Sequence, residues 1–323
     1  MMNLTRIKDF SRFLKTLSTF FDEHGYFEVR TPVLSSEVIP ESAIEVFETA
    51  FRHPYNLDQK LFLLPSPELY MKTLLAQGSG PIYQISPCFR NGEQSGPYHN
   101  PEFTMLEWYT PKADYLDSLK LCEELLDFCA KQLGLAEEQW KPPYLRLTMN
   151  QAFKQILNLD LSRLQDLESL KKAALDLELE ISQDAGWEEV FNQIFLNFVE
   201  PKLPQEKPLF LTDYPDQIPC LAKHLVHQPC YQRWELYARG IELANCFTEE
   251  DDYHKLKTLF DQEQRLKNKA LVPTLYPENF LKNLKKGFPP SSGVAMGLER
   301  LFMVLYNLKT IEEVLIFPYS PVG

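Results

Sequence analysis

One arginine, a glycine-containing loop and a row of alternating aromatic and polar residues lie between residues 89 and 109. The segment reads FRNGEQSGPYHNPEFTMLEWY, with Arg90 directly before the loop. The glycines and the proline of the loop favour a turn between two strands. Alternate residues of the returning strand would share one face, and these are Phe103, Met105, Glu107 and Tyr109. This set suits a nucleotide, because a guanidinium binds phosphate bidentately and a phenyl ring stacks on a purine.

A second arginine follows a glycine-rich strand near residue 300. The chain reads SSGVAMGLERLFMVL from residue 291, and Gly293 and Gly297 leave a strand backbone that a ligand could approach. Arg300 stands at the start of an apolar, helix-like run, where it could reach a phosphate near a helix N-terminus. Either segment alone could be a surface hairpin or an ordinary strand–helix junction. Arg90 stands beside a predicted hairpin and Arg300 at a predicted strand–helix junction. Although they are 210 residues apart, we expect the two arginines to form one phosphate site.

Two glutamates seven positions apart could bind a metal ion beside that phosphate. In RWELYARGIELANCFTEEDD these are Glu235 and Glu242, and Gly240 could bend or bulge the strand so that both carboxylates face one side. Such carboxylates hold Mg²⁺ against nucleotide phosphates. Asn245 and Glu249 add acceptors for a ligand ammonium group. The simpler alternative is an acidic strand end without a ligand.

The segment SPELYMK opens a helix at residue 66. Ser66 could cap this helix, Pro67 would occupy its first turn and Glu68 would face its positive end. Capping alone explains all three residues, so a binding role for Glu68 depends on the other segments.

Helices and strands of mixed order must position these residues. Residues 3–24 show the apolar spacing of an amphipathic helix, and the strand that follows is interrupted by Pro32. Residues 115–204 are mostly helical in pattern. Strands are expected at three further places, namely 61–64, 209–211 and 234–247. Because hairpin-like turns and long excursions separate the strands, we predict an α+β fold with an antiparallel sheet flanked by helices.

The composition is that of an acidic globular protein. Of 323 residues, 33 are Lys or Arg and 45 are Asp or Glu, which gives a net charge of −12. This charge favours a protein or small-molecule substrate over nucleic acid. No apolar run reaches the length of a bilayer span and the N-terminus lacks an apolar signal core, so we expect a cytoplasmic protein without membrane contact. The six cysteines show no CxxC pair, which indicates reduced thiols.

Taken together, these segments resemble the catalytic domain of class II aminoacyl-tRNA synthetases, and most closely that of the lysyl branch. The helix before Pro32 resembles motif 1, FRNGE and HNPEF resemble motif 2, and GVAMGLER resembles motif 3. SPELYMK and ELANCFTE resemble further segments of the lysyl active site. The resemblance implies ATP and Mg²⁺ as cofactors, a homodimer, and attack of an amino acid carboxylate on the α-phosphate of ATP to give an aminoacyl-adenylate.

The same resemblance implies roles for individual residues. Arg90 and Arg300 would be catalytic, Phe103 and Arg300 would sandwich the adenine, and Glu235 and Glu242 would hold Mg²⁺. The residues implied to bind ATP are Arg90, Asn91, Gly92, Glu93, Asn100, Phe103, Glu235, Leu236, Gly297 and Arg300. Those implied to bind the amino acid are Ser66, Pro67, Glu68, Glu107, Tyr109, Glu242, Asn245, Glu249 and Ala295.

Departures from the lysyl-tRNA synthetases narrow the expected function. The motif 1 helix begins near residue 3, so we expect one catalytic domain over 1–323, with a helical insertion at about 112–205 and no N-terminal anticodon-binding OB-fold domain. This architecture resembles stand-alone paralogues that activate (R)-β-lysine and transfer it to a lysine of elongation factor P, without tRNA. Ala295 replaces the usual glycine of motif 3, which could favour a β-amino acid. The sequence Arg-Asn-Gly-Glu replaces the usual Arg-Asn-Glu, so Glu93 could take the adenine-facing position.

Other activities of the same fold stay open. A truncated lysyl-tRNA synthetase-like enzyme would use α-lysine on tRNA or another acceptor, and would need a basic tRNA-binding surface. A regulatory paralogue would normally have lost the phosphate or metal residues. An amide ligase of the asparagine synthetase kind would not need the lysine-type acids Glu68 and Glu249. Because the arginines and acids are all present, we expect ligation of β-lysine to elongation factor P.

Overall fold

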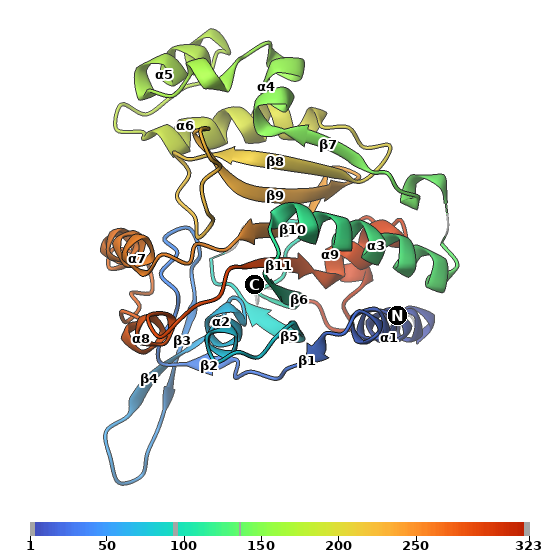
Figure 1. Ribbon diagram of the computed structural model, residues 1–323, viewed down its shortest axis with the longest axis vertical. Helices are drawn as coiled ribbons and strands as arrows, with labels where there is room; N and C mark the ends of the chain where they lie inside the picture. Colours follow the sequence, from blue (N-terminus) through green and yellow to red (C-terminus); the bar gives the residue numbers. More distant parts are fainter. Residues whose placement is uncertain (1–3, 93–95, 136, 320–323) are drawn as a thin grey trace.

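A large sheet of eight strands forms the centre of the molecule (Figure 1). The computed structural model describes residues 4–92, 96–135 and 137–319. In spatial order the strands are β1 (Phe27–Glu28), β5 (Ile82–Phe89), β6 (Glu102–Pro111), β11 (Ser291–Gly297), β10 (Ile241–Thr248), β9 (Cys230–Ala238), β8 (Leu209–Pro215) and β7 (Leu145–Thr148).

Antiparallel pairing dominates this sheet. The six strands from β5 to β8 pair antiparallel, and β5 with β6 and β9 with β10 are neighbours along the chain as well as in space. The edges differ, because β1 pairs parallel with β5 and β7 pairs parallel with β8. The predicted α+β class is confirmed, with an antiparallel centre inside a mixed sheet. The edge strands are only 2 and 4 residues long, which is too short for a readable alternation.

One face of the sheet is covered by α1 (Leu4–Glu23), α3 (Tyr115–Leu133) and α9 (Leu298–Leu305). Apolar side chains of these helices and of the sheet form the largest core, which also includes Trp140 of η1 (Glu138–Trp140). In α1 the buried Phe13, Leu17 and Phe20 recur at helical spacing, which confirms the helix predicted for this segment. A capping box at Asp114 starts α3, and a left-handed Gly134 ends it.

A second core lies at the β7–β8 edge of the sheet, at the top of Figure 1. The helices that form it are α4 (Met149–Leu157), α5 (Leu167–Asp176), α6 (Trp187–Ile194) and the π-helical turn η3 (Phe195–Val199), with the short helices η2 (Leu161–Arg163) and η4 (Glu200–Lys202). The stretch predicted to be mostly helical therefore also contains the strand β7. Because α3 joins the main core, residues 112–205 divide between two cores. A single domain with a helical insertion there stays a prediction.

The opposite face of the sheet is covered only in part. The helices α2 (Glu68–Ala76), α7 (Tyr253–Lys267) and α8 (Glu278–Leu284) pack around a third core on this side. A small sheet in the order β2 (Leu34–Ser35), β4 (Gln59–Leu63) and β3 (Phe47–Phe51) adjoins it, and the β3–β4 hairpin projects from the molecule (Figure 1). Near the C-terminus, η5 (Ile311–Glu313) completes the elements. The uncovered part of this face is where the candidate site lies.

Within the described ranges, each helix is either too short or too polar to cross a bilayer.

Candidate active site

A cavity of about 370 Å³ opens over the uncovered face of the large sheet. Residues of β6, β10 and β11 form its floor, and residues of α2, α9 and the segment 36–46 line its sides. A cavity of this size can hold a small molecule.

The β5–β6 hairpin predicted around the motif 2 segment is present. The backbone N–H of Arg90 donates to the carbonyl of Pro101 at 3.0 Å, which closes the hairpin next to the loop. The guanidinium of Arg90 lies 5.2 Å from the centre of the Phe103 ring. As predicted, alternate residues of β6 face the cavity, namely Phe103, Met105, Glu107 and Tyr109.

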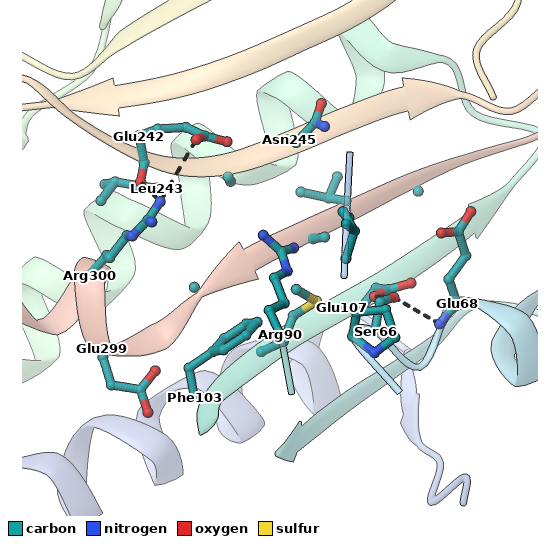
Figure 2. A pocket seen from close by; sticks show the side chains of 18 of the residues that line it. Ser66, Glu68, Arg90, Phe103, Glu107, Glu242, Leu243, Asn245, Glu299 and Arg300 are labelled. Carbon is teal, nitrogen blue, oxygen red and sulfur yellow. Dashed lines mark hydrogen bonds and ion pairs between the residues drawn. The ribbon is translucent and has the colours of Figure 1, made fainter. Parts of the chain in front are cut away.

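The cavity has two chemically different ends. Figure 2 shows Arg90 between one end that holds Phe103 and Arg300 and another that holds Ser66 and Glu107. The first end offers an aromatic ring and guanidinium groups, which suit a purine and phosphates. The second end offers carboxylates, which suit ammonium groups.

A buried lysine joins two carboxylates at the second end. The ammonium of Lys72 lies 2.5 Å from Glu68 Oε1 and 2.6 Å from Glu249 Oε2, and Lys72 is only 3% exposed. Glu68 precedes Lys72 by one turn of α2, whereas Glu249 directly follows β10. The ion pairs therefore connect the helix to the sheet.

A third carboxylate lies beside them on β6. Glu107 accepts hydrogen bonds from the hydroxyls of Ser66 and Tyr109, each at 2.6 Å. The Ser66 oxygen also accepts from the backbone N–H of Glu68 at 3.0 Å. The helix α2 begins at Glu68 with Pro67 as its N-cap. Ser66, predicted as the cap, therefore lies one position before it, and Pro67 takes the cap position instead of the first turn.

This end of the cavity holds more carboxylates than cations, and the pKa values of its buried groups are shifted. Burial, followed by the charge of Glu68, raises the pKa of Glu107 to about 8, and burial raises the pKa of Glu249 to about 7. Burial alone would lower the pKa of Lys72, but Glu249 and Glu68 outweigh that effect and raise it. Burial thus raises the pKa values of the acids, and the surrounding carboxylates raise that of the single ammonium. A ligand with further ammonium groups would stabilise the ionised acids.

Arg300 occupies the first turn of α9, as predicted. Its Nη1 donates to the carbonyl of Glu242 at 3.2 Å and lies 3.7 Å from the carboxylate of the same residue. The preceding Glu299 is buried and accepts from the backbone N–H of Thr104 at 2.9 and 3.0 Å. Because Thr104 follows Phe103, this contact fixes α9 relative to the aromatic ring.

The two glutamates predicted to bind Mg²⁺ lie on different strands. The prediction that Gly240 bends or bulges a single strand is wrong, because Gly240 belongs to a two-residue turn between β9 and β10. Arg239 and Gly240 have φ values of 53° and 75°, which match the turn type that joins right-twisted strands. Glu235 thus lies on β9 and Glu242 on β10.

A bulge one step further along β10 aligns the polar residues. Glu242 pairs with Tyr237 and Asn245 pairs with Glu235, and the register shifts at Leu243 between them. Cross-strand partners share a face, so the bulge places Glu242 and Asn245 on one side despite their odd spacing. Asn245 Oδ1 is buried without a hydrogen-bond partner in the described chain, as expected for a group that awaits a ligand.

Only one of the two predicted metal ligands lines the cavity. Glu242 does, whereas Glu235 is buried and accepts from the Arg233 guanidinium and, at 2.8 Å, from the Tyr237 hydroxyl. Burial, followed by the charge of Glu235, raises the pKa of Glu242 to about 7, so the two carboxylates interact. In the ranges that the structure describes, no three His, Cys, Asp or Glu residues gather as a metal site. Glu242 alone faces the cavity as a carboxylate donor, with Glu235 on the neighbouring strand, and this fits Mg²⁺, which takes most of its ligands from phosphates and water.

The cavity brings together most of the predicted site residues. Those that line it are Ser66, Glu68, Arg90, Asn100, Phe103, Glu107, Tyr109, Glu242, Asn245, Glu249, Ala295, Gly297 and Arg300. Those outside its lining are Pro67, Asn91, Gly92, Glu235 and Leu236. Leu236 is fully buried in the main core, so only its backbone is near the site. Glu93 lies outside the described residues.

Ala295 occupies the middle of the cavity floor. In the sheet it pairs with Glu107 on β6 and with Asn245 on β10. Its methyl group therefore lies between two polar side chains that face the ligand space.

Sequence reasoning missed three acidic or lysine residues of the cavity and its wall. Lys72 carried one readable signal, its spacing of four from Glu68 on a helix, but its burial depends on the distant Glu249. Glu299 looked like an ordinary first-turn acid of α9. Glu41 lies in a segment without strand or helix periodicity, and it lines the cavity.

Comparison with known proteins identifies the family of this site. The profile of the family described as tRNA synthetases class II (D, K and N) matches residues 2–321. The chain belongs to this class II tRNA synthetase family. The fold predicted from motifs 1 to 3 is thereby confirmed.

Class II relatives of two kinds match the chain. It is 38% identical over 311 residues to the elongation factor P–(R)-β-lysine ligase of Hamiltonella defensa, covering 94% of this chain and 92% of that protein. It is 37% identical to the ligase of the same name from Proteus mirabilis, over 95% of this chain and 93% of that protein. The lysine–tRNA ligase of Pelotomaculum thermopropionicum is 36% identical over 95% of this chain, which spans 62% of that enzyme.

Proposed function

We propose that this protein is a ligase that activates (R)-β-lysine with ATP and transfers it to the ε-amino group of a lysine of elongation factor P. The observation that carries the proposal is a two-ended cavity, with Arg90 between a nucleotide-binding end and an end rich in carboxylates. Relatives named for this activity, matched over more than nine tenths of their length, support the choice of substrate and acceptor.

The first step joins the amino acid to AMP. One oxygen of the substrate carboxylate attacks the α-phosphorus of ATP, and the bond to pyrophosphate breaks. Arg90 would bind the α-phosphate, and Phe103 and Arg300 would hold the adenine. Glu68, Glu107 and Glu249 would bind the ammonium groups and so aim the carboxylate at the phosphorus. Since no side-chain nucleophile takes part, positioning and charge neutralisation supply the rate.

The second step releases AMP. The neutral ε-amine of the acceptor lysine attacks the carbonyl carbon of the adenylate, the bond to the phosphate oxygen breaks, and the amine loses a proton as the amide forms.

Mg²⁺ completes the proposed site. Glu242 and Glu235 would hold it, and the ion would neutralise negative charge on the ATP phosphates.

Assembly and location are part of the proposal. We propose a homodimer formed through α1 and the segment that follows it, where Leu4 of α1, Phe27 of β1 and Leu34 of β2 expose apolar side chains. We propose a cytoplasmic location, as expected from the sequence. We also propose that the protein acts without tRNA, because a net charge of −12 opposes binding to a polyanion.

Transfer of α-lysine to tRNA is the second candidate, favoured by the identity to lysine–tRNA ligases. The two candidates share the adenylate and differ in the acceptor. A single assay can therefore separate them.

The test is the intact mass of elongation factor P after incubation with the protein, ATP, Mg²⁺ and either (R)-β-lysine or α-lysine. We expect the mass of one lysyl group to be added, most rapidly with (R)-β-lysine. Arg300→Ala should remove both this gain and amino acid-dependent ATP–pyrophosphate exchange, without loss of the fold. Exchange without a gain would redirect the search to tRNA, and exchange by Arg300→Ala would contradict the site.

A further inference from the structure

Glu41 is the cavity acid whose carboxylate has no hydrogen bond or ion pair within the described chain. The other five all have one: Glu68 and Glu249 contact Lys72, Glu107 contacts Ser66 and Tyr109, Glu242 contacts Arg300, and Glu299 contacts Thr104. Glu41 is half-buried, and even partial removal of a carboxylate from water is unfavourable unless a partner, here a ligand, supplies a compensating contact. Glu41 is therefore the acid most available to a cationic ligand.

We infer that Glu41 binds the substrate ammonium group nearest the reacting carboxylate, and so contributes to the choice between α- and β-amino acids. This inference rests on the proposed function and adds a residue to its site. The segment 36–46 has no regular structure over most of its length. The inference gives this segment a role in substrate selection.

The position of Glu41 along the cavity supports this assignment. The backbone N–H of Asn91, the residue after Arg90, donates to the carbonyl of Glu45 at 2.9 Å, which places the segment 36–46 beside Arg90. In agreement, the charges that act on the Glu41 carboxyl group include those of Glu68 and Arg90. Arg90 marks the place of the α-phosphate, where the substrate carboxylate reacts. A substrate ammonium bound between Arg90 and Glu68 is therefore the one close to that carboxylate, namely the α-ammonium of α-lysine or the β-ammonium of β-lysine.

Glu249 takes the opposite end of the substrate. The carboxylate of Glu249 lies over Gly293, where a Cβ atom would collide with it. Gly293 in turn pairs with Tyr109 at the far end of β6. Phe103, beside Arg90, lies six residues from Tyr109, which is about 20 Å along a strand. Glu249 and Tyr109 thus suit the distal ammonium, and Glu41 the proximal one.

The segment that carries Glu41 is held in place by three carboxylates. Glu37 accepts from the backbone N–H groups of Asn279 and Phe280 at the start of α8, at 3.1 and 3.2 Å. Glu263 accepts from the backbone N–H of Ser42 at 2.7 Å. Glu45 accepts from the backbone N–H groups of Leu271 and Val272 and forms an ion pair with the ammonium of Lys267.

Such anchoring gives Glu41 a fixed position above the sheet. A side chain held on a rigid support selects geometry better than a mobile one, because less entropy is lost on binding. Burial, followed by the charge of Glu68, raises the pKa of Glu41 to about 7, which agrees with a carboxylate that lacks a cation.

Two half-substrates test the assignment. 3-Aminohexanoic acid keeps the proximal amino group of β-lysine and lacks the distal one, whereas 6-aminohexanoic acid keeps only the distal one. Both would be measured as competitive inhibitors of ATP–pyrophosphate exchange, with wild type and Glu41→Gln. For Glu41→Gln we expect the KM for (R)-β-lysine and the inhibition constant of 3-aminohexanoic acid to rise about tenfold or more, as after loss of a charge-assisted hydrogen bond.

The inhibition constant of 6-aminohexanoic acid should not change, and kcat should fall much less than KM rises. A rise for 6-aminohexanoic acid alone would place Glu41 at the wrong end of the substrate and overturn the inference. Equal rises for both inhibitors, or no change, would also overturn it. Exchange by the wild type is measured first, and its absence with both lysines would refute the proposed function itself.

Glu37→Gln is the matched control from the same segment. Since Glu37 only anchors the segment, its loss should lower the melting temperature and weaken both inhibitors alike. Glu41→Gln removes no contact within the described chain and should melt at or above the wild-type temperature. A lower melting temperature for Glu41→Gln would indicate a structural role and overturn the inference.

Discussion

Lys72 sets the charge balance of the carboxylate end, and its replacement by methionine tests that role. Without the ammonium, Glu68 and Glu249 would face each other with no cation between them. We expect Lys72→Met to raise the KM for the amino acid about tenfold or more, and to cost about 3–5 kcal/mol of unfolding free energy, as is usual when one partner of a buried pair is removed. Exchange kinetics and chemical denaturation measure the two effects.

Lys255→Met provides the comparison for that variant. Lys255 also forms an ion pair with a glutamate, Glu250, but its side chain is 58% exposed. Exposed pairs contribute little, so this variant should resemble the wild type in both assays. Equal behaviour of the two variants would contradict a special role for Lys72.

Ala295 offers a second prediction at the scale of one residue. Its methyl group lies between Glu107 and Asn245 on the cavity floor, where it limits how deeply a substrate backbone can settle. We expect Ala295→Gly to raise the use of α-lysine relative to (R)-β-lysine by about tenfold, the discrimination that one methyl group can supply. The ratio of kcat/KM for the two amino acids in the exchange assay measures this. An unchanged ratio would refute it.

At the scale of elements, β11 carries two glycines in different surroundings. A Cβ atom on Gly293 would lie 2.3 Å from Glu249 Oε1 and 2.4 Å from the Tyr109 ring. A Cβ atom on Gly297 would lie 3.9 Å or more from its nearest neighbours, Arg300 and Leu243. The absence of a side chain at Gly293 thus makes room for two protein side chains, and at Gly297 it leaves space open at the nucleotide end.

Alanine at each glycine should separate the two ends of the cavity. Gly293→Ala should displace Tyr109 and Glu249 and so raise the KM for the amino acid about tenfold or more, as misplaced site residues do. Gly297→Ala should raise mainly the KM for ATP. Steady-state exchange with each substrate varied in turn gives both constants, and the reverse pattern would contradict the assignment of the ends.

The helices and strands also show which parts of the fold could be predicted from the sequence. The β5–β6 hairpin could be predicted, because a glycine-containing loop and a strict alternation lie within one short stretch. The place of Gly240 could not, since a turn and a bulge both use glycine, and only the pairing of β9 with β10 decides between them. Lys72 and Glu41 were missed for a related reason. Their surroundings come from segments far apart in the chain, which local periodicity does not report.

At the scale of the whole molecule, the buried acids couple folding to pH. Glu107 and Glu249 are each 2% exposed, and their pKa values rise from 4.5 to about 8 and about 7. The folded state therefore binds more protons than the unfolded state between these values, so stability falls as pH rises from about 5 to 8. A lysine substrate, whose two amino groups both stay protonated over most of this range, should reverse the trend by pairing with the ionised acids.

We accordingly expect (R)-β-lysine with ATP and Mg²⁺ to raise the melting temperature more at pH 8 than at pH 6. Melting curves across this range, with and without the ligands, measure the difference. In Glu107→Gln one of the titrating groups is absent, so the fall in stability of the free protein with pH should be shallower than in the wild type. A ligand effect that is larger at pH 6, or an unchanged slope in Glu107→Gln, would show that these carboxylates do not control the coupling. The stability of the free protein would then depend on pH through groups outside the cavity, and the carboxylate end would have to bind its ligand without a change in protonation.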